Sequence, residues 1–312
     1  MADTLLDYAF TVNPIVPLPA ASAAYIKQAL SIVKPKDGVA EAVVLCTSKA
    51  QVQALTDNAD VLELFNAGMN AVYVLPIADI ADAEALIEAS KNKYFTVLVS
   101  RDFNQGEIGS LNVGTFKGIV AYSFDDEQLA KAFATASRRC GFYGLLSNGA
   151  KNMFYAFGKF LSSTSWRNQQ YIEMPYDDAI SDVETAKAYF NDGVSFVLNS
   201  EQYGKRLAFF AAGKQAITAP YIYENLTLDA QSAAVSYIAL NNPDYTITEA
   251  SLIEDEVQQV LNRKYVSTGL VVSANVSIEL INDNWRAAGV IAVPSPKALW
   301  GIDVDLIQGE AQ

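Results

Sequence analysis

Hydrophobic positions in residues 21–147 fall into short apolar runs that alternate with stretches of helical spacing. The runs predict strands, because strands buried on both faces are short and almost continuously apolar. The predicted strands are 43–46, 71–75, 95–100, 118–122 and 141–146. The predicted helices between them are 21–34, 60–67, 82–91 and 125–138. Regular alternation of this kind predicts an α/β domain with a largely parallel sheet.

Residues 148–295 show a less regular mixture of the two patterns, which predicts a second, α+β domain. The predicted helices are 151–161, 181–191, 228–240 and 249–264, and the predicted strands are 171–174, 194–198, 270–273, 276–281 and 289–294. Ser181 and Thr246, each followed by Glu three residues later, match the capping box that opens a helix. The fold class is therefore α/β, changing to α+β towards the C-terminus, with a mixed sheet and flanking helices.

The two ends of the chain, residues 1–20 and 296–312, are predicted to be extended β arms. Apolar and other residues alternate in both, as in a strand with one apolar face. The apolar positions are Tyr8, Phe10 and Val12 at one end and Trp300, Ile302, Val304 and Leu306 at the other. Nearby prolines favour extended connectors. Each arm strand is either an edge strand of its own sheet or an addition to the open sheet edge of a neighbouring copy.

The composition excludes several classes of function. Of 312 residues, 51% are hydrophobic and 18% charged, which is typical of a globular protein, and the net charge of −13 argues against direct binding of nucleic acid. The chain has no histidine, which removes Ser-His-Asp and Cys-His relays and paired-histidine metal sites. We therefore expect no enzyme activity, no cofactor and no metal. Residues 1–7 lack a basic leader pattern and no apolar run reaches about 20 residues, so we expect synthesis in the cytoplasm and no membrane insertion.

The two cysteines, Cys46 and Cys140, are too few for a disulfide framework. A reduced state is the default interpretation, and a disulfide within or between subunits is the alternative. Arg138 and Arg139 could lower the pKa of the Cys140 thiol.

The remaining sequence patterns give only weak indications of a metal or catalytic site. Acidic clusters occur at 125–127, at 177–182 and at 254–256, without the spacing of a calcium loop. The first cluster suits a helix N-terminus, where negative charge complements the helix dipole. Ser31 and Lys34 match Ser-x-x-Lys on a predicted helix, but the elements that accompany this motif in Ser-Lys enzymes are missing.

Three passages carry a resemblance to a known family. The first passage runs from Leu55 to Asp60, continues through Leu64 to Gly68 and leads into the predicted strand 71–76. The second passage is Tyr189 to Val194, which also leads into a predicted strand. The third is the long predicted helix 249–264, which is followed by a β-rich end. This layout, together with the terminal arms, resembles the contractile tail sheath proteins of phages and related injection machines.

The resemblance implies a structural subunit of a virion tail. Such subunits stack in rings around a tail tube, between a baseplate and a tail terminator, and their arms add strands to neighbouring copies. On triggering, the sheath contracts and drives the tube through the host envelope. By position, the arm strands named above would make these contacts. Two alternatives remain open: another virion structural subunit of the tube or capsid, and a histidine-free α/β enzyme or ligand-binding protein.

Overall fold

The computed structural model describes residues 25–294 apart from 91–93, 109–110, 112–117, 137, 164–171, 177–179, 181, 201–203, 214, 242–245 and 282–283. Both predicted arms lie outside the described residues. The positions concerned are Tyr8, Phe10, Val12, Trp300, Ile302, Val304 and Leu306.

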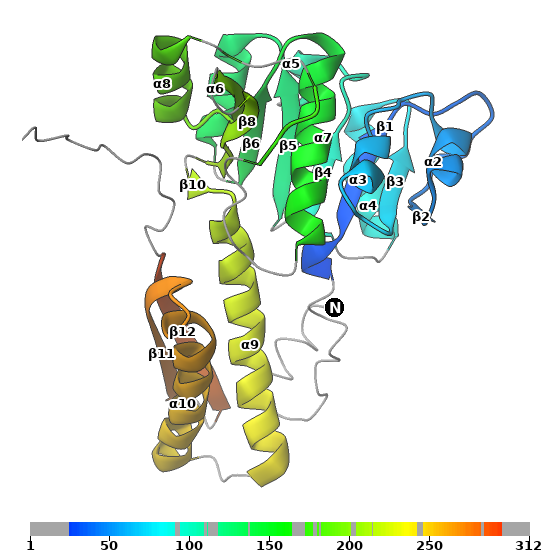
Figure 1. Ribbon diagram of the computed structural model, residues 1–312. Helices are drawn as coiled ribbons and strands as arrows, with labels where there is room; N and C mark the ends of the chain where they lie inside the picture. Colours follow the sequence, from blue (N-terminus) through cyan, green and yellow to red (C-terminus); the bar gives the residue numbers. More distant parts are fainter. Residues whose placement is uncertain are drawn as a thin grey trace, which may run out of the picture.

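A six-stranded sheet forms the centre of an α/β body (Figure 1). Its strand order is β2-β3-β1-β4-β5-β6. The strands are β1 (Ala29–Val33), β2 (Val44–Cys46), β3 (Val72–Pro76), β4 (Thr96–Val99), β5 (Ile119–Phe124) and β6 (Arg139–Tyr143). All neighbours are parallel except the pair β2–β3 at one edge, so the sheet is mixed. The predicted mixed sheet with flanking helices is confirmed.

Helices cover both faces of this sheet, as expected for strands that are apolar on both sides. The helices of the body are α2 (Lys49–Leu55), α3 (Leu62–Asn66), η2 (Ile80–Asp82), α4 (Ala83–Ala89), α5 (Gln105–Ile108), α6 (Glu127–Thr135) and α7 (Leu146–Ser162). Residues of α3 and α7 share one core cluster with Ala121 of β5, whereas residues of α4, α5 and α6 share the other with Tyr122. The alternation of side chains along β5 therefore builds two cores.

Close backbone approach explains two glycines in this packing. A Cβ atom at Gly158 of α7 would lie 2.6 Å from Ala67 Cβ, and one at Gly141 of β6 would lie 2.6 Å from Ala130 O. These distances are shorter than carbon atoms tolerate without movement. Glycine thus lets α7 approach α3 on one face of the sheet and lets α6 approach β6 on the other.

The chain then closes the β6 side of the sheet. This part consists of α8 (Val183–Asp192), β7 (Phe196–Ser200), β8 (Gly204–Phe209), β9 (Ala211–Ala212) and β10 (Gln215–Ala216). Ser195 lies parallel to β6: its N–H donates to Gly141 O at 2.8 Å, and its carbonyl accepts from Tyr143 N at 2.8 Å. Two backbone groups on the outer side of β6 are thereby paired.

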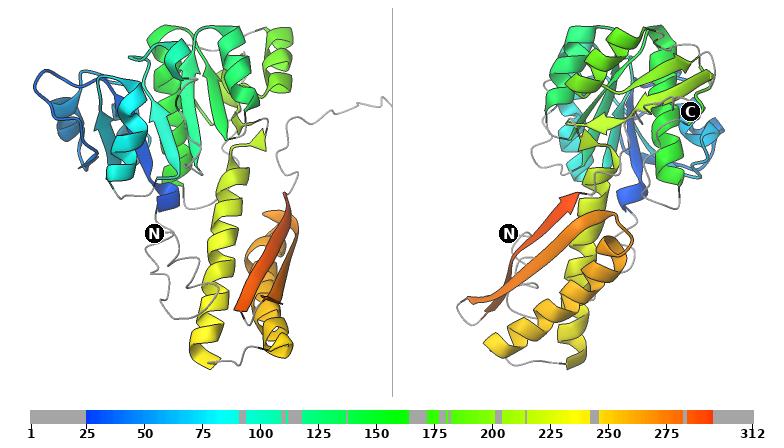
Figure 2. Two further views of the ribbon diagram at one scale, coloured as in Figure 1. Left: turned by 180° about the vertical axis from the view of Figure 1, so that it is seen from behind. Right: turned by 60° about the vertical axis from the view of Figure 1, so that its left-hand side comes forward.

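Residues 218–294 form a stalk that projects from the body (Figures 1 and 2). Its elements are α9 (Thr218–Asn241), α10 (Ile247–Leu261), the π-helical turn η3 (Asn262–Val266), β11 (Val271–Ile281) and β12 (Asn284–Pro294). The β11–β12 hairpin and α10 lie together on one side of α9 (Figure 2). The stalk has a hydrophobic core of its own, which joins α9 residues such as Leu226 to Ile253 of α10 and Val271 of β11.

The largest error of the sequence prediction concerns residues 21–34. A helix was expected, but residues 29–33 form β1, which lies between β3 and β4 and is buried at all five positions. A strand covered on both faces has no period-2 pattern, so its apolar residues can imitate helical spacing. The strand at 43–46 is confirmed as β2, but it lies at the edge of the sheet, and Leu45 is exposed.

Several boundaries also differ. Helix α9 begins ten residues before the expected 228, and the two strands expected at 270–273 and 276–281 form one strand. A strand was expected at 171–174. Residue 171 lies outside the described part of the chain, and Glu173 makes an isolated antiparallel bridge to Arg206. The N-cap of α8 is Asp182 and not Ser181, since Asp182 accepts from Thr185 N at 2.7 Å. The cap of α10 by Thr246 is confirmed.

The expected domain limits, 21–147 and 148–295, stay a prediction. The boundary between them falls inside α7, a helix that packs on the six-stranded sheet.

Candidate functional site

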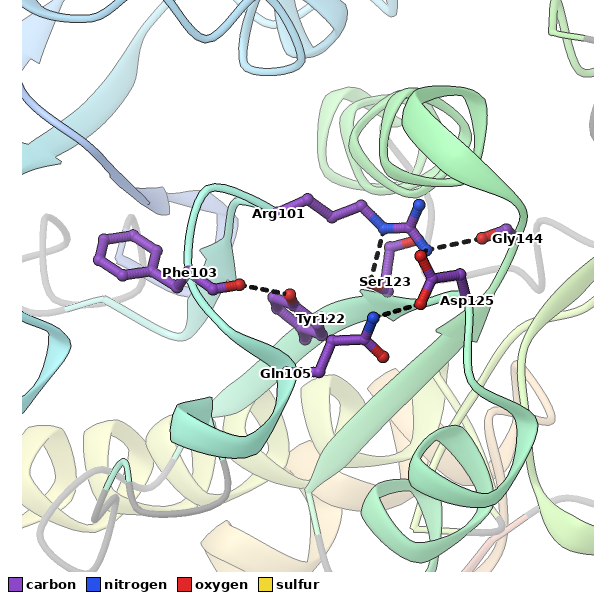
Figure 3. Close-up of polar contacts among 7 residues, drawn as sticks. All are labelled: Arg101, Phe103, Gln105, Tyr122, Ser123, Asp125 and Gly144. Carbon is purple, nitrogen blue, oxygen red and sulfur yellow. Dashed lines mark hydrogen bonds and ion pairs between the residues drawn. The ribbon is translucent and has the colours of Figure 1, made fainter.

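The carboxyl ends of β4 and β5 are the first place to look for a site, because open α/β sheets bind ligands beyond this edge. Arg101 follows β4 and reaches across the edge (Figure 3). Its Nε donates to Ser123 O at 2.9 Å, and its Nη2 donates to Gly144 O at 2.7 Å. The same guanidinium lies 3.9 Å from the carboxylate of Asp125. Arg101 therefore ties together the loops that follow three parallel strands.

Neighbouring side chains strengthen this tie (Figure 3). Gln105 Nε2 donates to Asp125, and the Tyr122 hydroxyl donates to Phe103 O at 2.8 Å. Burial raises the pKa of Tyr122 to about 12, so the phenol stays protonated and remains a donor at neutral pH. The cluster holds loops in place by contacts within the chain, and we assign it a structural role.

Asp60 lies close to the same edge and has the electrostatics of a buried carboxyl group. Burial, and secondly the negative charge of Asp102, raise its pKa to about 6, although Lys151 and Arg101 act in the opposite direction. Within the described part of the chain, no group of three or more histidine, cysteine or acidic residues is arranged to hold a metal ion.

The predicted acidic clusters have separate local roles where the structure describes them. Asp126 caps α6 by accepting from Leu129 N at 2.9 Å, as expected for a helix N-terminus. Residues 254–256 belong to α10. Asp182 caps α8, while residues 177–179 lie outside the described part.

The Ser-x-x-Lys match forms no site, and the helix expected to carry it is wrong, because residues 29–33 are a strand. Side chains three positions apart on an extended chain point to opposite faces. Ser31 is buried within β1, whereas Lys34 Nζ donates to Ala78 O and lies 4.5 Å from the centre of the Phe103 ring. The structure does not bring the hydroxyl and the amine together.

Cys46 and Cys140 are free, buried and far apart. They belong to β2 and β6, the two outermost strands of the sheet. Strands are spaced by about 4.8 Å, so the separation is roughly 24 Å, beyond the reach of a disulfide. Burial raises the pKa of Cys140 to about 12, so the expected lowering by arginine is wrong. A bridge between subunits is a separate prediction that this geometry does not test.

The β11–β12 hairpin is the second candidate site, as a surface for another chain. It pairs residues from Val271↔Pro294 to Ile281↔Asn284, with irregularities next to Val271 and Ser277. In the described part of the chain it is a two-stranded sheet. Hairpins of this size are marginally stable alone and offer backbone groups at their edges.

The stalk holds this hairpin in a defined position. The buried face of α10, with Ala250, Ile253, Val257 and Leu261, packs in the stalk core. Asp229 of α9 accepts from the Tyr265 hydroxyl at 2.7 Å and from Lys264 Nζ at 2.8 Å, which fixes the turn between α10 and β11. Burial and Asp229 both raise the pKa of Tyr265, so this donor stays protonated.

Side chains of α10 also contact one edge of the hairpin. Gln258 Nε2 donates to Ala274 O at 2.6 Å, Gln258 Oε1 accepts from Val276 N at 3.1 Å, and Glu254 Oε2 accepts from Ile278 N at 3.1 Å. Sequence reasoning missed Glu254, Gln258 and Arg101. The spacing of Glu254 and Gln258 places them on one helix face, but the partner strand is not visible in the sequence.

The α/β body and the stalk with its hairpin together have the fold of contractile tail sheath proteins. A chain of the helical sheath of the anti-feeding prophage in its contracted state matches with a TM-score of 0.66 and 11% identity, over 96% of each chain. A chain of the anti-feeding prophage baseplate matches with a TM-score of 0.68 and 11% identity, over 91% of this chain and 94% of that one. The sheath tail protein from Listeria innocua matches with a TM-score of 0.58 and 8% identity, over 88% and 98%.

Sequence comparison adds no further relative. No protein-family model matches the chain, and no curated protein matches it significantly. Among the described residues, no helix combines the length and apolarity required to cross a membrane.

Proposed function

We propose that this protein is a structural subunit of a contractile tail sheath. Copies polymerise in stacked rings around a tail tube, bound at one end to a baseplate and at the other to a tail terminator. Contraction of the assembly drives the tube through the host envelope. The protein resides in the tail of the particle and carries out no catalysis.

The similarity to solved sheath chains supports this proposal. These matches include chains from a helical sheath and from a baseplate, and they extend over nearly the full length of both partners. A subunit of this kind needs no active site, because the energy of contraction is a difference between two packings of the same copies. The absence of histidine is therefore compatible with such a role, which requires no catalytic side chain.

The observation that carries the proposal is the β11–β12 hairpin at the stalk. Its eleven-residue strands form a two-stranded sheet in the described part of the chain. The alternating segments at residues 8–12 and 300–306 fit the role of added strands that complete this sheet in a neighbouring copy. Each buried apolar side chain contributes about 1.5–3 kcal/mol before the ordering of the segment is subtracted.

A non-closing contact between copies builds a helical assembly. The prolines beside the two segments, Pro14 and Pro296 among them, favour extended connectors. Such connectors let the bodies reorient while the strand hydrogen bonds keep neighbours linked.

Electron microscopy of the purified protein tests the assembly. We expect tubes or rings, and deletion of residues 1–13 should leave a folded body that no longer polymerises. Phe10→Asp tests the apolar face of this segment, and Thr11→Asp on its other face is the matched control. Sheath-length particles from the deletion variant would contradict strand exchange. A compact monomer or dimer of the full chain would favour an enzyme or ligand-binding protein instead.

A further inference from the structure

Helices α9 and α10 run antiparallel in the stalk (Figure 1), and a groove lies between them. Its cavity volume is about 420 Å³, and its lining includes Ala233 and Tyr237 of α9 and Val260 of α10. Leu240, near the end of α9, also lines the groove and is 84% exposed. The groove therefore offers apolar surface, next to polar groups, to another chain.

The groove lies on the side of α10 that faces away from the hairpin. Glu254 and Gln258 bond to β11. Glu256, Val260 and Arg263 line the groove instead. Each residue of an α-helix is turned by about 100° from the one before, so positions 256, 260 and 263 form one stripe and positions 254 and 258 form another. The hairpin and the groove thus use different sides of the same helix.

Two opposite charges on the groove side of α10 are unpaired among the described residues. There, neither the Glu256 carboxylate nor the Arg263 guanidinium takes part in an ion pair or a hydrogen bond. Both residues are exposed. In contrast, Lys264 donates to Asp229 at 2.8 Å. The groove therefore carries one acid and one base that are available to another chain.

The spacing of these two charges makes the groove side of α10 self-complementary. Glu256 and Arg263 are seven residues apart in the sequence, which corresponds to about 10 Å along the helix axis. Val260 lies close to their midpoint. When two such helices meet antiparallel around a twofold axis at this midpoint, Glu256 of each copy faces Arg263 of the other. Both ion pairs then form together.

The other charges of α10 favour the same arrangement. Its acidic residues include Glu249 and Asp255, whereas the basic residues Arg263 and Lys264 follow at its C-terminal end. Antiparallel contact sets the acidic part of one helix against the basic end of the other, and it also opposes the two helix dipoles. Parallel contact would set like charges side by side.

We infer that two copies of the unassembled protein pair through this groove around a twofold axis near Val260, with Glu256 of each copy bound to Arg263 of the other. The pairing also covers Leu240. The inference goes beyond the proposed function, because a sheath grows by contacts that do not close, whereas this contact is complete after two copies. The pair is a form of the free subunit and is separate from the particle.

Charge reversal tests the pairing in the full chain. Sedimentation velocity of the soluble fraction, over a range of concentrations, gives the dissociation constant of the pair. Arg263→Glu or Glu256→Arg alone turns both ion pairs into repulsions and should raise this constant about tenfold. Ser251→Arg, at an exposed position on the opposite side of α10, is the matched control and should leave the constant unchanged.

Mixing the two variants gives a sharper test. A pair of one Arg263→Glu copy and one Glu256→Arg copy regains both ion pairs, so the mixture should associate as tightly as the original protein. The double variant, which carries both changes in one chain, should do the same. If neither restores association, the groove faces a different surface of its partner, and the symmetric pairing is overturned.

Disulfide trapping tests the position of the axis. Val260→Cys places a thiol where a residue meets the same residue of the second copy, so oxidation should link two chains. Ser251→Cys faces away from the groove and should give no link. The native cysteines are buried and give no background. Links at position 251, or none at position 260, would overturn the pairing.

The pairing and the sheath function can fail separately. A soluble fraction that stays monomeric at all concentrations would overturn the pairing, whether or not tubes form. Absence of tubes and rings would count against the sheath function and would leave the sedimentation measurement unaffected.

Discussion

The hydroxyl groups of Thr96 and Tyr221 lie 2.6 Å apart in the buried joint between the body and the stalk. Thr96 belongs to β4 in the middle of the sheet, and Tyr221 belongs to the first turn of α9. The Tyr221 ring also contacts Phe95 and Phe160, with ring centres 4.8 and 4.7 Å apart. This joint fixes α9 to the body, so the start of the stalk should move together with the body.

The joint makes a measurable contribution to stability. Tyr221→Phe leaves the buried Thr96 hydroxyl without this partner, and we expect a loss of about 1–3 kcal/mol in the free energy of unfolding. Tyr223→Phe on the same helix, where the side chain is half-buried, is the control and should change it by less than about 0.5 kcal/mol. Urea unfolding measures both. Equal stability of the two variants would show that the joint bond contributes nothing.

The contact between α7 and α3 depends on the missing side chain of Gly158. Gly158→Ala places a Cβ atom 2.6 Å from Ala67 Cβ, and overpacking of this kind costs about 1–3 kcal/mol. Alanine improves helix propensity by up to about 1 kcal/mol, so the net effect is destabilising. Gly106→Ala in α5 meets its first neighbour at 3.7 Å and should be neutral or slightly stabilising. A more stable Gly158→Ala variant in thermal unfolding would contradict the close approach.

Asp60 should give the protein a specific pH dependence. Its pKa is raised from 3.8 to about 6, so the folded state binds this proton more tightly than the unfolded state. Its contribution to stability is therefore greatest below about pH 4 and is lost as the pH rises through about 6. A difference of one in pKa corresponds to about 1.4 kcal/mol, so roughly 2–3 kcal/mol is at stake.

Asp60→Asn removes this titration. We expect the variant to be more stable than the original at neutral pH and the difference to shrink towards pH 4, as measured by urea unfolding across the range. Asp57→Asn is the control, since Asp57 is exposed and pairs with Lys36 at the surface, where ion pairs contribute about 0–1 kcal/mol. A stability difference that does not vary with pH would rule out a raised pKa at Asp60.

Both thiols should be unreactive in the folded protein. Burial raises the pKa of Cys46 and of Cys140, and reaction requires an accessible thiolate. An aromatic disulfide reagent at about pH 8 should label neither cysteine until urea unfolds the chain, after which both react. Rapid labelling of Cys140 before unfolding would contradict its buried position in β6, where its Sγ atom lies 3.5 Å from the hydroxyl oxygen of Ser195.

The sequence was most informative where one element has one exposed face. The sequence predicts helix α6 within two or three residues, and it marks the N-terminus by the acidic cluster 125–127, where negative charge complements the helix dipole. The cap at Thr246 is predicted from its capping box. In contrast, the sequence of β1 predicts a helix, because the strand is buried on both faces and its apolar and polar residues do not alternate.

Local periodicity along this chain was enough to establish an α/β layer, a later α+β part and several helix ends, because these features depend on residues a few positions apart. The position of β1 between β3 and β4, the bond between Thr96 and Tyr221, and the cover of β11 by Gln258 required the folded chain. They depend on contacts between distant segments, and the sequence contains the groups that make such contacts without recording which groups meet.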